Sequence, residues 1–254
     1  MVRRRLRPGG RWAWISLVLA LFAVGGSLLA AWGSALGWWH WTTGLGLLPW
    51  MFALALVAIA TGLFSRFARR DRQVVAVTAV LIAAATAGFL ANEERRMAAA
   101  PAIHDISTNL DDPPAFRTLA IRSDLLSGVP MVDRPGYQAL SPRDRWKAAH
   151  FEAYADLRTI DFEGDRTAAV RVAEASARRL GWTIVAIDEA GGRVEATTRS
   201  RYFGLADDLA LRVRPAASGK STSVDLRSVA REGISDHGRG ARHLRAWSRE
   251  IVRR

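Results

Sequence analysis

The sequence predicts three transmembrane α-helices followed by an α+β domain, in which two helices cover one face of an antiparallel sheet. Residues 12–91 are largely apolar and carry almost no charge outside one short loop. Residues 92–254 have an ordinary, charged composition and contain segments in which apolar and polar residues alternate. Such alternation is typical of antiparallel strands with one covered face. The chain is therefore expected to combine a membrane part with a folded domain.

Three apolar runs account for the membrane part: Trp12–Ala31, about Leu45–Phe64 and about Val74–Ala91. Each is close to the roughly 20 residues with which a helix crosses the hydrocarbon core. The first run is longer than the ~7–15 apolar residues of a signal-peptide core, and two further runs follow it. We therefore expect an uncleaved span, and we place Pro49 in the first turn of the second helix, where its missing N–H costs least.

The arginines around these runs predict the orientation. Five arginines precede the first run, none lies in 33–43, and four follow the second run. They are Arg3, Arg4, Arg5, Arg7 and Arg11, then Arg66, Arg69, Arg70 and Arg72. Under the positive-inside rule, the N-terminus is cytoplasmic and the C-terminal domain lies on the periplasmic side of a bacterial inner membrane. Seven of the ten tryptophans lie before residue 51, as expected for side chains at the membrane interfaces.

The net charge of +12 is concentrated in the membrane part, where nine arginines and one aspartate give +8 up to residue 91. The remaining 27 basic and 23 acidic residues give +4. A nucleic-acid partner is not expected, because its binding domain would itself be strongly basic. The absence of cysteine excludes disulfides and thiolate chemistry.

We divide the chain into a membrane anchor (1–91), a proline-rich connecting segment that begins the soluble domain (92–150), and an α+β domain (151–254). The prolines of the middle segment predict irregular structure. Asp165 or Thr167 is expected to cap a helix that ends at Leu180, before Gly181. Strands are predicted at 182–187, 193–201, 209–214 and 224–227, and a last helix is predicted from an Asp236 cap to about Val252.

Arginine recurs on one face of the predicted sheet. The set comprises Arg193, Arg199, Arg201, Arg212, Arg214, Arg227 and Arg231. Glu195 and Asp225 share this face, so one interpretation is cross-strand charge pairing. The other is an anion-binding surface, because guanidinium groups match phosphates and carboxylates. We take Arg212, Arg214, Arg227 and Arg231 as candidate binding residues.

The last helix carries a basic stripe at three- or four-residue steps: Arg239, Arg242, Arg245, Arg249 and Arg253. The stripe is either a solvated face or a surface that contacts the acidic head groups of membrane lipid. Tethering to the membrane favours such contact by raising the effective concentration of lipid. Arg242, Arg245 and Arg249 join the candidate binding residues.

Acidic residues and histidines suggest no firm catalytic or metal site. Asp207 and Asp208 are adjacent in a strand and would point to opposite faces, so they cannot easily share an ion. His104 and Asp105 could orient a general base, but no nucleophile motif accompanies them. There is also no phosphate-binding loop, dinucleotide fingerprint or zinc-protease motif. We expect no cofactor and no metal.

Several segments resemble the domain-of-unknown-function family 1499. They are residues 101–108, 113–116, 181–182, 194–197, 203–204, 207–208, 212–213, 224–228 and 235–236. The resemblance spans about 101–250 and implies the same domain, but it implies no activity, cofactor or partner. Ala230, Gly240 and His243 stand where the family tends to have Ser, Asn and Arg.

The leading hypothesis is a binding or accessory domain for an envelope component, an envelope protein or an anionic ligand, with no catalytic role. Two alternatives remain open. One is an envelope hydrolase that uses Asp and His groups, and the other is a structural subunit of a membrane complex.

Overall fold

The computed structural model describes residues 9–65, 70–126, 129, 136–215 and 221–253. It divides into two compact units. The membrane unit comprises Met1–Arg96 with Ser200–Gly204, and the C-terminal domain comprises Met97–Arg199 with Leu205–Arg254.

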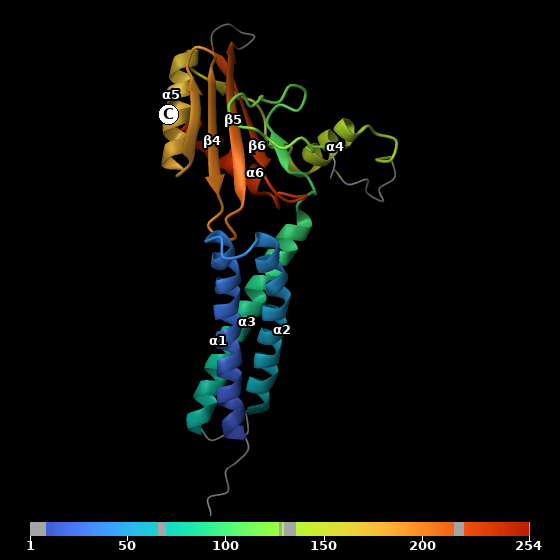
Figure 1. Ribbon diagram of the computed structural model, residues 1–254, viewed down its shortest axis with the longest axis vertical. Coiled ribbons are helices and arrows are strands. Elements are labelled where there is room, and N and C mark those ends of the chain that lie inside the picture. Colours follow the sequence, from blue (N-terminus) through green and yellow to red (C-terminus); the bar gives the residue numbers. More distant parts are fainter. Residues whose placement is uncertain (1–8, 66–69, 127–128, 130–135, 216–220, 254) are drawn as a thin grey trace, which may run out of the picture. The chain divides into compact units, whose positions relative to one another are not determined.

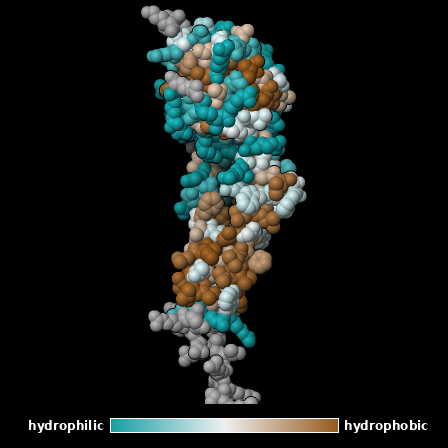
Figure 2. Space-filling view, turned by 90° about the vertical axis from the view of Figure 1, so that its left-hand side faces the viewer, coloured by the Kyte–Doolittle hydropathy of each residue, from teal (hydrophilic) through white to brown (hydrophobic). Residues whose placement is uncertain are grey.

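The membrane unit contains α1 (Gly9–Ala35), α2 (Trp41–Phe64) and α3 (Arg70–Ala99). All three helices are long and apolar enough to cross a membrane, which confirms the predicted spans. Hydrophobic residues dominate their surface in Figure 2. Large apolar side chains such as Phe22 and Val74 are 66% and 68% exposed, as expected for residues that face lipid.

Small residues line the helix contacts of the membrane unit. Alanines from all three helices form its buried cluster, among them Ala20, Ala58 and Ala83. The Ser16 hydroxyl of α1 donates a hydrogen bond of 2.7 Å to the Ala58 carbonyl of α2. Small side chains and interhelical hydrogen bonds are how helices associate in lipid, where the hydrophobic effect contributes little.

Pro49 lies inside α2 and not in the predicted first turn of the helix. The helix begins at Trp41, four residues before the predicted apolar run, so Pro49 lies in its third turn. Proline has no N–H, so the helix lacks one of its internal hydrogen bonds at this point. Proline is tolerated in membrane helices when neighbouring groups compensate.

The C-terminal domain is built on a six-stranded antiparallel sheet (Figure 1). Its strands are β1 (Asp105–Ser107), β2 (Ile160–Phe162), β3 (Thr183–Asp188), β4 (Arg193–Arg199), β5 (Ala206–Pro215) and β6 (Thr222–Ala230). The order is β1-β6-β5-β4-β3, and β2 also pairs with β6.

The edge beside β6 is one strand position occupied by two short strands. β1 pairs with residues 227–229 of β6, and β2 pairs with residues 222–224. Between them, the Thr108 side chain and backbone bind Leu226: the Leu226 N–H donates to Thr108 Oγ1 at 2.8 Å, and the Thr108 N–H donates to the Leu226 carbonyl at 2.9 Å. The chain between β1 and β2 leaves this edge and returns to it.

Helices α5 (Arg166–Arg179) and α6 (Arg239–Val252) pack against the same face of the sheet (Figure 1). Leu209, Leu211 and Val213 point toward them because successive strand residues alternate between faces. Trp182 is 7% exposed and meets Trp247 of α6 edge-to-face, with ring centroids 5.2 Å apart. These observations confirm the predicted α+β fold with two helices on one face.

Asp165 is the N-cap of α5, and its carboxylate accepts the Ala168 N–H at 2.7 Å, as predicted. Gly181 has φ +78°, the left-handed conformation expected after this helix. At α6 the N-cap is Gly238, not Asp236. The Asp236 carboxylate nevertheless accepts the N–H groups of Gly238 and Gly240, both at 2.7 Å.

Two elements lie where the proline content predicted irregular structure. They are β1 and the helix α4 (Pro142–Tyr154). Ser141 caps α4 by accepting the Asp144 N–H, and Pro142 opens the helix. A proline in the first turn favours a helix, since the N–H that it lacks would have no helical partner there.

Candidate functional site

The face of the sheet opposite α5 and α6 carries charged side chains. The register places Arg193, Arg212 and Asp225 in one row across β4, β5 and β6. Part of this face is covered by the segment between β1 and α4, whose residues 112–119 bind the side chains beneath it. The polar face of the sheet is therefore partly an internal surface of the domain.

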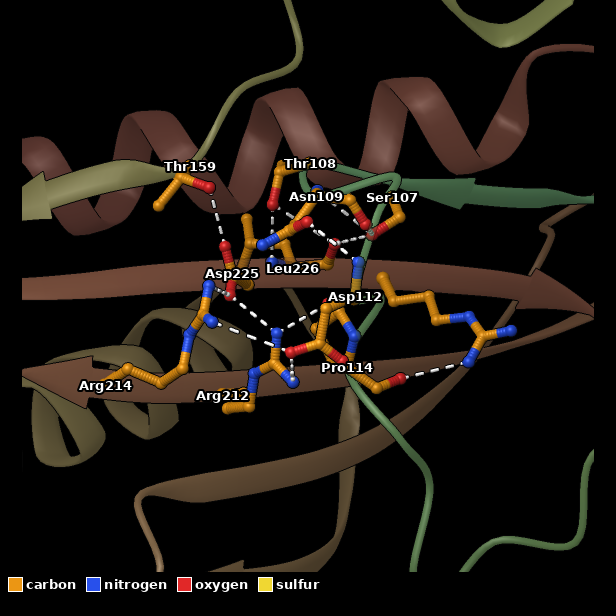
Figure 3. Close-up of polar contacts among 11 residues, drawn as sticks. Ser107, Thr108, Asn109, Asp112, Pro114, Thr159, Arg212, Arg214, Asp225 and Leu226 are labelled. Carbon is orange, nitrogen blue, oxygen red and sulfur yellow. Dashed lines mark hydrogen bonds and ion pairs between the residues drawn. The ribbon is translucent and has the colours of Figure 1, made fainter. Parts of the chain in front are cut away.

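Asp225 is the centre of this network (Figure 3). Its side chain is 0% exposed. One carboxylate oxygen accepts hydrogen bonds from Arg212 at 2.9 Å and Arg214 at 2.7 Å, and the other accepts the Thr159 hydroxyl at 2.6 Å. Arg212 also binds the Asp112 carboxylate at 2.9 Å. One buried charge thus connects β5, β6 and both ends of the segment between β1 and β2.

A second buried pair joins β1 to β6. The Arg227 guanidinium binds both oxygens of Asp105, at 2.8 and 2.7 Å. It also donates to the Pro114 carbonyl at 3.1 Å and lies 5.7 Å from the centre of the Phe116 ring. Such bidentate geometry is favoured for Arg–carboxylate pairs.

Glu195 on β4 holds the covering segment by its backbone. Its carboxylate, 3% exposed, accepts the N–H groups of Arg117, Thr118 and Leu119. Three consecutive N–H groups around one carboxylate form a pocket for an anion, which here is part of the protein.

Helix α4 covers the outer edge of β1. The Trp146 indole N–H donates to the Asp105 carbonyl at 2.8 Å, and the Ser107 N–H donates to His150 Nε2 at 3.2 Å. Trp146 and His150 are one helical turn apart, and Asp105 and Ser107 are two residues apart on a strand, so the two spacings match. Two backbone groups on the outer edge of β1, the Asp105 carbonyl and the Ser107 N–H, are satisfied in this way.

A pocket of about 320 Å³ opens where β1 ends and β2 has not yet begun. Its wall consists of the two ends of the segment between β1 and β2 and one face of α4. The residues that line it are Thr108–Asp111, His150, Phe151, Tyr154, Ala155 and Leu157–Thr159. Pockets for small ligands have volumes of roughly 300–1,000 Å³.

His150 lies at the inner end of this lining and is 1% exposed. Burial lowers the pKa of His150 to about 4, although Asp105 and Asp156 act in the opposite direction. Its ring is therefore neutral at physiological pH, and Nε2 accepts the Ser107 N–H, which assigns the proton to Nδ1. The rings of Trp146 and Tyr154 flank it at 5.9 and 5.6 Å.

The other face of the sheet carries a second polar cluster at the start of α6. Asp207, 1% exposed, binds Arg239 through both oxygens at 3.0 and 2.9 Å and His243 at 3.2 Å. Burial alone would raise the pKa of Asp207, but the hydrogen bonds from His243 and Arg239 lower it. Burial raises the pKa of Asp236 to about 6, against the two N–H groups that it accepts.

The structure separates the residue pairs that could have formed a metal or catalytic site. Asp207 faces α6, whereas Asp208 faces the opposite side and binds Arg231 at 2.8 Å. His104 Nδ1 contacts the Ile234 carbonyl at 3.1 Å, while Asp105 binds Arg227. Within the described residues, no group of three or more His, Cys, Asp or Glu could hold a metal ion.

The candidate arginines of the sheet are all engaged by carboxylates. Arg212 and Arg214 bind Asp225, Arg227 binds Asp105, and Arg231 binds Asp208. This is the cross-strand and cross-segment pairing that the first interpretation of the arginine face predicts.

The arginines of α6 differ from one another. Arg245 binds Asp156 at 2.6 and 2.8 Å, whereas Arg242 and Arg249 are exposed. Arg239 is 9% exposed and faces Asp207, so its assignment to the basic stripe was wrong. The first turn of α6 rests on the sheet, which turns this side chain inward.

The residues that line the pocket were not predicted as site residues. Thr108 and Thr159 are 51 positions apart in the sequence and become neighbours only because β1 and β2 share one edge. A usable signal did exist for α4. Ser141-Pro142 with Asp144 is a helix start, and His150 and Tyr154 then share a face at a four-residue spacing.

Comparison with known sequences identifies the domain. The sequence profile of the family described as "Protein of unknown function (DUF1499)" matches residues 105–251, which is more than half of the chain. The chain belongs to the DUF1499 family. No curated protein sequence matches it.

The match begins at Asp105 and ends at Ile251, so the DUF1499 region contains the whole sheet and all of the buried Asp–Arg pairs. Several of the segments on which the resemblance was based carry these pairs. They are the segments with Asp105, Asp207, Asp208, Asp225 and Arg227. In this chain, these residues position segments of the domain.

The network around Asp225 predicts a strong effect on stability. We expect Asp225→Ala to lower the free energy of unfolding by about 2–3 kcal/mol, because Arg212 and Arg214 lose a shared carboxylate and the Thr159 hydroxyl loses its acceptor. As a matched control, Asp156→Ala removes an exposed partner of Arg245 and should cost less than about 1 kcal/mol. Urea denaturation of Met97–Arg254 measures both. Equal losses of stability in the two variants would contradict the central role assigned to Asp225.

His150 predicts a specific pH dependence. Its pKa in the folded domain is about 4, below the ordinary 6.5, so its neutral form stabilises the fold. This contribution is fully present above pH 6.5 and is lost as pH falls toward 4. His150→Gln keeps an acceptor for the Ser107 N–H but cannot titrate. Between pH 7 and 4, the wild-type domain should lose about 3 kcal/mol more stability than the variant. Parallel stability curves would contradict this.

Proposed function

We propose that this DUF1499 protein is a bacterial inner-membrane protein whose C-terminal domain lies in the periplasm and binds a component of the cell envelope in the pocket between β1, β2 and α4. The membrane anchor is supported by three helices long and apolar enough to span the bilayer. The pocket supports binding, because it is of ligand size and is built from groups on three separate segments.

The arginine distribution supports the orientation. Arg3, Arg4, Arg5, Arg7, Arg66 and Arg69 lie outside the described residues, so their counts are those of the sequence. Among described side chains, Arg72 lies 5.8 Å from the Trp14 ring, and Trp12 lies 5.9 Å from Phe64. The start of α1, the end of α2 and the start of α3 therefore lie at one end of the bundle. The positive-inside rule assigns that end to the cytoplasm.

The chemistry of the pocket favours a ligand with both polar and apolar groups. Its lining includes the polar residues Asn109 and Arg158 together with Phe151, which is 64% exposed, while the hydroxyls of Thr108 and Thr159 are already bound to Leu226 and Asp225. An exposed ring beside polar groups can cover an apolar surface of a ligand while the polar groups fix its orientation.

The bonding of the nearby acidic groups favours binding over hydrolysis. Asp111 of the lining binds Lys147 at 2.6 Å, Asp225 and Asp105 are each held by arginine, and His150 Nε2 accepts a backbone N–H. A general base needs a free acceptor within reach of the substrate proton. The rigid network is well suited to hold the lining in one arrangement.

The exposed face of α6 is a second candidate surface. Arg242 and Arg249 are exposed, and each arginine near an anionic membrane surface can contribute about 1 kcal/mol. We propose that they contact anionic lipid head groups. Arg245 contributes less to this contact, because its charge is shared with Asp156.

The orientation is tested by labelling a single cysteine in a chain that has none of its own. Phe151→Cys, at the pocket, should react with a membrane-impermeant maleimide in intact cells whose outer membrane is made permeable. Gly10→Cys, at the start of α1, should react only after the inner membrane is lysed. The reverse pattern would contradict the periplasmic location.

The binding function is tested by photo-crosslinking in intact membranes. A benzophenone amino acid at Phe151 should form a discrete adduct with an envelope component. The same probe at Ile187, which is 40% exposed on β3, is the control and should not form it. The same adducts from Phe151 and Ile187, or none from Phe151, would contradict the proposal that the pocket binds a ligand.

The proposed contact of α6 with lipid is tested in the same way. A probe at Arg249 should give lipid adducts if α6 contacts the membrane.

A further inference from the structure

A groove of about 740 Å³ lies between α2 and α3 of the membrane unit. Ala60, Leu63 and Phe64 line it from α2, and Gln73, Val77 and Leu81 line it from α3. All of these side chains except Gln73 are apolar. The groove is more than twice the volume of the pocket in the C-terminal domain.

Beside the groove, the two helices come into close contact at Gly62. A Cβ atom added to Gly62 would collide with Val80 Cγ2 and lie 2.7 Å from the Ser16 hydroxyl, so no side chain fits there. Ala60 and Ala76 beside this contact are too short to fill the space on either side. The two helices therefore leave an open apolar groove between them.

A membrane supplies one obvious kind of molecule to such a groove. Water is excluded, since the hydrocarbon core has no water to fill an apolar space. An empty groove would lose the dispersion contacts of its lining. The lining on α3 runs from Gln73 to Leu81, which is about 12 Å along a helix axis at 1.5 Å per residue. That length matches a large part of an acyl chain.

The polarity of the groove also matches that of a phospholipid. Gln73, its one polar lining residue, lies at the end where α3 begins. Arg72 is adjacent, with its guanidinium carbon 5.8 Å from the Trp14 ring. Guanidinium groups bind phosphates well, and a tryptophan at this level is typical of the head-group layer. The apolar remainder of the groove extends from this end toward the middle of the bilayer.

We propose that the groove between α2 and α3 binds one acyl chain of an anionic phospholipid, with the phosphate at Arg72 and Gln73. The lipid completes the packing of the two helices beside their close contact at Gly62. This inference concerns the membrane unit and does not depend on the function proposed for the C-terminal domain.

Native mass spectrometry of the full chain, released from a mild detergent, tests the proposal with phosphatidylglycerol and phosphatidylcholine as probes. The wild type should retain one phosphatidylglycerol, in preference to phosphatidylcholine. Ala60→Phe places a ring in the groove and should reduce retention at least tenfold. Ala53→Phe is the matched control on α2, outside the groove lining, and should retain the lipid.

Two further variants distinguish the contribution of the acyl chain to binding from that of the head group. Val77→Phe fills the groove from α3, where Val77 is 58% exposed, and should reduce retention as Ala60→Phe does. Arg72→Gln should weaken the binding of phosphatidylglycerol about fivefold and leave the binding of phosphatidylcholine unchanged, as expected for the loss of one charge near the phosphate. No retained lipid on the wild type, or equal retention in Ala60→Phe and Ala53→Phe, would overturn the proposal. A dimer that Ala60→Phe disrupts would assign the groove to a second copy of the chain instead.

Discussion

Buried carboxylate–arginine pairs determine the architecture of the C-terminal domain. Four aspartates with 0–3% exposure each bind an arginine from another element or from a different part of the chain. The pairs are Asp105 with Arg227, Asp207 with Arg239, Asp208 with Arg231, and Asp225 with Arg212 and Arg214. An unpaired buried charge costs several kcal/mol, so any arrangement that separates these partners is disfavoured. The pairs therefore select one relative placement of strands, α6 and the covering segment.

The pocket is a consequence of this arrangement. The edge strand beside β6 is interrupted between β1 and β2, where the chain leaves the sheet. Asp225 holds both ends of this segment at β6: one end through Arg212, which also binds Asp112, and the other through Thr159. Helix α4 then covers the exposed edge of β1 with Trp146 and His150. The space left between these parts is the pocket, and it is lined by groups that are already held in place.

The same observations explain why family membership says little about chemistry. The acidic and basic residues by which the chain resembles the DUF1499 family are those that hold the fold together. A search for reactive groups among them finds Asp207 and Asp208 on opposite faces and His104 turned away from Asp105. The pocket residues, by contrast, include Phe151 and Arg158, which lie outside the segments that suggested the family. Ligand specificity is expected to depend on these residues.

The sequence by itself determined the three membrane helices, the strands β3 to β6, the helices α5 and α6 and the family. These features follow from local patterns, namely hydropathy over about 20 residues, two-residue alternation and capping residues. It also placed Arg193, Arg212 and Arg227 on one face, because strand parity decides that, but its assignment of Arg201 to this face was wrong, since β4 ends at Arg199. What only the tertiary structure decided is which charges meet, since Asp105 and Arg227 are 122 residues apart and no local pattern encodes their contact. The shared edge of β1 and β2, the inward turn of Arg239 and the pocket were likewise decided by long-range pairing along β6, where the backbone groups of distant segments satisfy one another.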